Sequence, residues 1–141
     1  MNCKKFTIKS QEAIQQGQQI AQSYEHQQIE NSHILKGMFE VDENLIPHIF
    51  KKLGVNIELL KSLIDKTIES YSKVSGGDIT LSRNASKMLN TATAEAKKLK
   101  DEYVSLEHLL LAILSTKDTT SQILKDQGVT EEGLKLTIAE L

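Results

Sequence analysis

Glu30 and His33 are the two side chains whose spacing best fits a metal site. They stand three residues apart, so one helix could direct both at a single ion. His26 and His48 bring no obvious convergent partner, and the repeat described below places Ser105 where the first half has Glu30. The favoured interpretation is that these histidines are satisfied within the fold or face solvent. A stand-alone helical metalloenzyme that uses Glu30 and His33 is the alternative from another functional class.

The glycine pair Gly76 and Gly77 raises the question of phosphate binding. A phosphate-binding loop needs several glycines, followed by a lysine and a hydroxyl residue at the start of a helix. Asp78 follows this pair instead, and its negative charge would repel a phosphate group. The sequence therefore predicts a linker at this point, and it predicts that the chain binds no nucleotide.

No set of residues is arranged for nucleophilic or acid–base catalysis. Cys3 is the single cysteine, and no local signature places it or a serine beside a base. Carboxylates occur in adjacent pairs, but side chains one residue apart on a helix do not face each other. Those pairs are Asp101-Glu102 and Glu131-Glu132. We expect no catalytic residue, no metal and no cofactor in this chain.

The composition is that of an ordinary globular domain rich in helix. Apolar residues make up 39% and charged residues 26% of the 141 residues, which is enough for one hydrophobic core. Proline occurs once, so long stretches are free of helix breakers. These features favour an all-α fold.

Charge and cysteine content narrow the choice of partners and compartment. The formal net charge is −2, whereas binding to nucleic acid or to an anionic membrane needs a concentrated basic surface. A lone cysteine cannot form an intramolecular disulfide, which favours a reducing compartment. The N-terminus turns polar at once, unlike a signal peptide, and no apolar run approaches the ~20 residues that span a bilayer. We predict a cytoplasmic protein without nucleic-acid or membrane partners.

Comparison of the chain with itself reveals an internal repeat. At a shift of 75 residues, apolar, small and histidine positions of the first half fall on like residues of the second. After one gap the shift becomes 74, and a glycine then matches a glycine. The matched pairs include Phe6/Leu81, Ile14/Leu89, Gly17/Ala92, Ala21/Ala96, Ile29/Val104, His33/His108, Gly54/Gly128 and Leu60/Leu134. The chain therefore consists of two copies of one unit.

Each copy is predicted to form four helices. We expect a first repeat at 6–70, a linker at 71–79 and a second repeat at 80–141. The expected helix caps are Thr7, Asn44, Asn56, Ser82, Ser105 and Thr130, and the expected glycines just past a helix end are Gly54 and Gly128. The fold class that follows is all-α, with about eight helices in two pseudo-twofold-related repeats packed as one domain over residues 1–141.

Residues 101–114, which read Asp-Glu-Tyr-Val-Ser-Leu-Glu-His-Leu-Leu-Leu-Ala-Ile-Leu, resemble the most specific stretch of the Clp N-terminal repeat. That family has a Glu-His-Leu-Leu run followed by small and apolar residues, and the resemblance extends over 6–141. The first copy departs from the pattern, with Ser32 in place of the glutamate. The segments 73–78 and 123–129 are similar to those of the ClpB disaggregases, more than to those of the ClpC and ClpA unfoldases.

The resemblance implies a mobile domain above a hexameric ring of ATPase modules that threads polypeptide through its pore. The domain would engage unfolded or aggregated proteins and help to deliver them to the ring, with a co-chaperone as a further partner. ATP and Mg²⁺ would belong to the ring of a longer chain, and the isolated domain would be a monomer. The nearest alternative is an adaptor-binding domain, as in ClpC or ClpA unfoldases.

The resemblance also implies a substrate-binding surface, which in this family is an apolar groove flanked by polar residues. The residues of this chain that match the surface or adjoin it are Thr7, Leu89, Asp101, Tyr103, Glu107 and His108. Thr7 is also explained as a helix cap, and Leu89 also fits a core position on an apolar helix face. We expect their combination on one surface to bind extended hydrophobic segments of many sequences.

Overall fold

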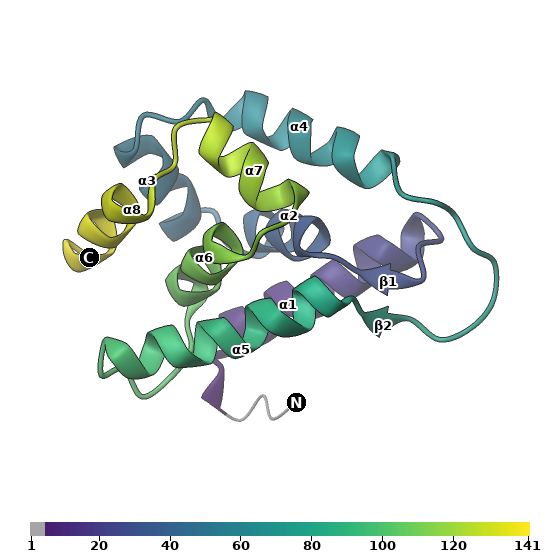
Figure 1. The fold of residues 1–141 in the computed structure, drawn as a ribbon, viewed down its shortest axis with the longest axis horizontal. Coiled ribbons are helices and arrows are strands. Elements are labelled where there is room, and N and C mark those ends of the chain that lie inside the picture. The colour runs from purple at the N-terminus through teal and green to yellow at the C-terminus, as the bar shows by residue number, and fades with distance from the viewer. Residues whose placement is uncertain (1–4) are drawn as a thin grey trace.

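The computed structural model of the protein describes residues 5–141, and its secondary structure is almost entirely helical (Figure 1). Cys3 lies outside the described residues. The helices are α1 (Ile8–Ser23), α2 (Asn31–Val41), α3 (Leu45–Lys52), α4 (Ile57–Glu69), α5 (Arg83–Lys98), α6 (Leu106–Ser115), α7 (Thr119–Asp126) and α8 (Glu131–Ala139). Two short strands, β1 (Gln28–Ile29) and β2 (Thr80–Leu81), form one parallel pair. The predicted all-α class with eight helices is confirmed.

Most of the predicted helix boundaries are confirmed by the hydrogen bonds that cap them. Side-chain oxygens at the N-terminal caps accept the backbone N–H three residues later, which satisfies a donor that the helix itself leaves free. The residues that do so are Thr7, Asn56, Ser82 and Thr130. Gly54 and Gly128 follow α3 and α7 with φ of +74° and +94°, a conformation that favours glycine.

Asn44 occupies the N-cap position of α3, as predicted, but the expected hydrogen bond from its side chain is absent. Asn44 makes no side-chain capping bond, because its backbone is already helical (φ −115°, ψ −66°) rather than extended. Asp42 does the capping instead: its Oδ2 accepts the N–H of Ile46 at 2.7 Å, and the side chain is buried.

We expect Asp42→Ala to lower the free energy of unfolding by about 1 kcal/mol, because the buried N–H of Ile46 would lose its acceptor. Asn44→Ala should stay within about 0.5 kcal/mol of the parent, as is usual for surface substitutions. Urea unfolding followed by circular dichroism measures both variants. A larger loss for Asn44→Ala than for Asp42→Ala would contradict this assignment of the cap.

The two repeats pair reciprocally across the molecule. Ile29 of β1 pairs with Leu81 of β2, and Phe6 forms a parallel bridge with Val104. A shift of 75 residues converts the first pair into the second with the roles of the repeats exchanged. The later helices follow the same rule, since α3 contacts α8 and α4 contacts α7 (Figure 1). This exchange is what a pseudo-twofold axis between the repeats produces.

One hydrophobic core runs through both repeats, with large side chains from α2, α3, α4, α5 and α6 fully buried. Within the first repeat, α1 and α2 approach closely, because Gly37 places its Cα against the backbone of α1 at Ala13 and Gly17. Residues 70–79, between α4 and β2, form neither helix nor strand. The division into repeats at 6–70 and 80–141 remains a prediction. In residues 5–141 no helix has the length and apolar character needed to cross a membrane.

Candidate functional site

His108 at the start of α6 holds an acidic side chain at the protein surface. Its Nδ1 accepts the backbone N–H of Ser105 at 2.9 Å, which leaves the ring proton on Nε2. Nε2 then donates to Oδ2 of Asp101 at 2.8 Å. The imidazole is 1% exposed, whereas the side chain of Asp101 is 51% exposed. The buried histidine therefore positions an accessible carboxylate.

The bridge between Phe6 and Val104 brings the start of α1 beside this carboxylate loop. The N–H of Thr7 donates to the carbonyl of Val104 at 3.0 Å. The hydroxyl of Thr7 accepts the N–H of Ser10 and donates to its Oγ at 2.9 Å, so it is used within the helix start. Thr7 and Asp101, far apart in the sequence, thus belong to one region of the molecule.

Glu107 lies one residue before His108, in the first turn of α6. Its Oε1 is buried and has no hydrogen-bond partner in the described part of the chain. A buried carboxylate oxygen without a donor is costly, because it has lost water and gained nothing in return. Glu107 as a whole is half-buried, so its carboxylate is a group that a donor on a bound molecule would stabilise.

Exposed apolar side chains lie close in sequence to Thr7 and Asp101. Ile8 is 76% exposed, Tyr103 49% and Leu99 46%. We call the region formed by Thr7, Ile8, Leu99, Lys100, Asp101, Tyr103 and Glu107 the second-repeat surface. It combines apolar side chains with acceptor oxygens, an arrangement suited to a polypeptide segment with both apolar and donor groups.

The first repeat contains the matching histidine at the start of α2. Nδ1 of His33 accepts the N–H of Glu30 at 2.8 Å, and Nε2 lies 3.0 Å from Nδ1 of His26. Both ring nitrogens are therefore engaged within the fold. Residues 5–141 hold no group of three or more histidine, cysteine, aspartate or glutamate side chains placed to bind a metal ion. The geometry gives the metalloenzyme alternative no support.

The family profile described as "Clp repeat (R) N-terminal domain" matches residues 5–127. The chain belongs to this family. It is 50% identical over its whole length to the chaperone protein ClpB of Bacteroides thetaiotaomicron and 43% identical to that of Porphyromonas gingivalis. In both comparisons the chain spans 16% of the length of the relative.

Solved structures of this family share the fold. The N-terminal domain of Hsp104 from Candida albicans aligns with a TM-score of 0.85 at 19% identity, over 97% of this chain and 91% of that one. The N-terminal domain of ClpD from Arabidopsis thaliana aligns with a TM-score of 0.76 at 17% identity, over 99% of this chain and 96% of that one. At 19% and 17% identity, the structural similarity establishes the fold alone.

The structure assigns Leu89 to the core of the Clp repeat domain. Its side chain is 1% exposed, among the apolar residues that α5 buries. The expectation that Leu89 offers an exposed apolar contact is therefore not met, and His108 likewise acts from below the surface. The exposed apolar side chains of this region are those of Ile8, Leu99 and Tyr103, of which the sequence analysis singled out Tyr103 alone. The helical spacing of Ala85, Leu89, Ala92 and Ala96 was the signal for burial.

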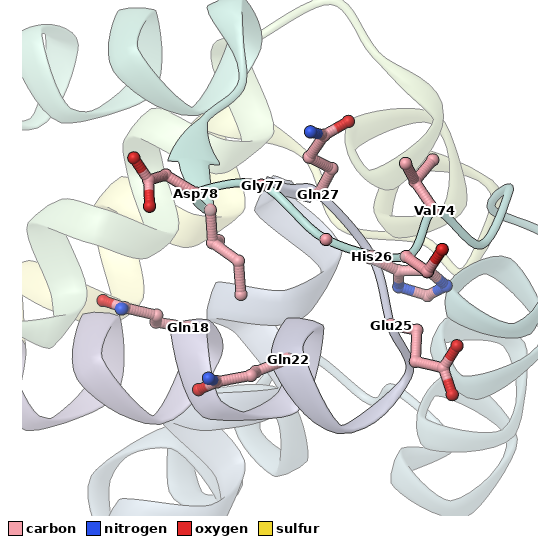
Figure 2. Close-up of a pocket in the computed structure, with 11 residues that line it drawn as sticks. Gln18, Gln22, Glu25, His26, Gln27, Val74, Gly77 and Asp78 are labelled. Carbon is pink, nitrogen blue, oxygen red and sulfur yellow. The ribbon is translucent and has the colours of Figure 1, made fainter.

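A cavity of about 660 Å³ lies at the other end of α1 from Thr7 (Figure 2). It is lined by polar side chains near the end of α1, including Gln18, Gln22 and Glu25, and by the linker from Val74 to Ile79. The acidic residues Glu25 and Asp78 are both among the residues that line it. None of the predicted substrate-binding residues lines this cavity.

Proposed function

We propose that this domain binds unfolded or aggregated polypeptides as the N-terminal substrate-binding domain of a ClpB-type, ATP-dependent disaggregase. The observation that carries the proposal is the second-repeat surface, where exposed apolar side chains lie close in sequence to the exposed carboxylate of Asp101 and to Glu107, whose Oε1 is buried without a hydrogen-bond partner in the described residues. Unfolded chains expose both apolar side chains and backbone N–H groups, which are the two kinds of group that this surface can accept.

The same proposal extends to the rest of the longer protein. The similarity to ClpB relatives supports a longer protein whose remaining part forms a hexameric ATPase ring. That ring would bind ATP and Mg²⁺ and would thread polypeptide through its pore. The domain would capture a client and release it to the ring, so weak and sequence-tolerant binding suits its task. Co-chaperones would be further partners of the assembly.

Removal of the surface charges is expected to weaken client capture. Asp101→Asn combined with Glu107→Gln should raise the Kd for an unfolded, reduced and alkylated model protein by roughly three- to ten-fold, because charge-assisted hydrogen bonds are among the stronger polar contacts. Fluorescence anisotropy with the labelled client measures this change, and circular dichroism checks that the fold is kept.

Glu58→Gln is the matched control, because Glu58 is an exposed carboxylate of the first repeat, in the first turn of α4. Its Kd should equal that of the parent. Equal binding by the parent and the Asp101/Glu107 variant would refute the assigned surface. Selective capture of a folded adaptor, with no affinity for the unfolded client, would refute the proposed function and favour the ClpC- or ClpA-type role.

A further inference from the structure

The linker covers the first repeat at the place that matches the second-repeat surface. The hydroxyl oxygen of Tyr71 lies 2.7 Å from Oγ of Ser32, and the Tyr71 ring centroid is 5.5 Å from those of His26 and His33. Three residues later, the N–H of Val74 donates to the carbonyl of Glu25 at 2.9 Å. Residues 71–74 are thus bound to the first repeat by one side-chain hydroxyl and one backbone N–H.

The second repeat has the same backbone at the corresponding positions. Glu25 and Lys100 both adopt the left-handed conformation, with φ of 60° and 59°. The next N–H in each repeat donates to the helix before it, from His26 to Ala21 and from Asp101 to Ala96. The carbonyls of Glu25 and Lys100 therefore have equivalent settings.

The side chains correspond as well. Glu107 occupies the position of Ser32, and Asp101, bonded to His108, occupies that of His26, bonded to His33. The carbonyl of Glu25 accepts Val74, but no N–H of residues 5–141 donates to the carbonyl of Lys100. Oε1 of Glu107 has no hydrogen-bond partner in the described residues, whereas Oγ of Ser32 shares a hydrogen bond with the hydroxyl of Tyr71, in which either oxygen can be the donor. Within the described chain, the second repeat lacks the occupant that the first repeat has.

We propose that an extended client segment binds the second-repeat surface as residues 71–74 bind the first repeat. Its backbone N–H donates to the carbonyl of Lys100, and a tyrosine three residues earlier donates its hydroxyl to Glu107. A carboxylate only accepts hydrogen bonds, so the client must supply the donor, and a tyrosine carries it on an apolar ring. This inference rests on the proposed function and specifies the kind of segment that is bound.

A peptide with the sequence of residues 69–76, Glu-Ser-Tyr-Ser-Lys-Val-Ser-Gly, is the probe. Blocked at both ends and labelled, it should bind the domain and shift the amide NMR signals of residues 100–108. Replacement of its tyrosine by phenylalanine, or N-methylation of its valine, should each weaken binding by about ten-fold. The domain variant Glu107→Ala should bind the tyrosine and phenylalanine peptides equally, as a double-mutant cycle requires.

Glu102→Gln is the matched control for charge, because Glu102 is an exposed acidic neighbour that the inference does not use. It should preserve the preference for tyrosine. Equal affinity of the tyrosine and phenylalanine peptides for the parent domain would overturn the inference, as would shifts confined to residues 25–33. If the unfolded client is still captured in a way that depends on Asp101 and Glu107, the proposed function survives that outcome.

Discussion

Gly37→Ala is expected to lower the free energy of unfolding by about 3 kcal/mol, although alanine is the better helix former. A Cβ on Gly37 would lie 2.5 Å from the carbonyl oxygen of Ala13 and 3.0 Å from the backbone N of Gly17. Both atoms belong to the backbone of α1, so no side-chain rotation can relieve the contact. The two helices would have to separate, and the core residues of α2 would lose part of their packing.

Thermal and urea unfolding measure the effect, with a midpoint expected about 10 °C below that of the parent. Gly76→Ala is the control for the replacement of a glycine as such. Gly76 has φ +80° and nothing within 4 Å of the added Cβ, so only the backbone strain of about 1 kcal/mol applies. A Gly37→Ala domain as stable as the parent would show that α1 and α2 do not approach as closely as the structure indicates.

The sequence predicted well what depends on neighbouring residues. Thr7, Ser82 and Thr130 were identified as caps because a hydroxyl before an amphipathic run needs only local geometry to reach a free N–H. The hydrogen bond predicted from the Asn44 side chain is absent for a related reason. Two acceptors, Asp42 and Asn44, precede α3, and the backbone path that chooses between them is set by burial of Asp42.

The contacts between the two repeats could not be predicted from the sequence. Self-comparison shows that two halves are alike, but it does not show that β1 pairs with β2 rather than within its own half. Strands of two residues carry no alternating pattern, so nothing marked Gln28–Ile29 or Thr80–Leu81 as strands. The same applies to the candidate site, since the bridge from Phe6 to Val104 joins the start of α1, with Thr7, to the segment that contains Asp101.

Acidification is expected to destabilise the domain through His33. Burial, followed by the neighbouring His26, lowers the pKa of His33 from 6.5 to about 4. The pKa of His26 is lowered too, chiefly by burial and then by Lys73. The ring of Tyr71 packs against both imidazoles. The residues that hold the linker against the first repeat therefore include the two histidines whose pKa is lowered in the folded state.

The direction of this pH effect follows from the number of protons that the folded and unfolded states bind. Because the pKa is lower in the folded state, the unfolded chain binds the proton more readily below pH 6.5, and stability falls with pH from there to about pH 4. A difference between 6.5 and about 4 corresponds to a loss of roughly 3 kcal/mol once both states are protonated. At pH 7 and above this loss is absent.

Urea unfolding between pH 7.5 and pH 4.5 would measure this loss, and His33→Asn isolates it from the carboxylates that also titrate in acid. An asparagine oxygen can take the place of Nδ1 as acceptor for the N–H of Glu30, but it cannot gain a proton. We therefore expect His33→Asn to be less stable than the parent at pH 7.5, yet to lose less stability on acidification. His48→Asn, at an exposed histidine, should keep the pH dependence of the parent. If the unfolding free energies of the parent and of His33→Asn fell equally with pH, the proton that is taken up on unfolding in acid would bind to a residue other than His33.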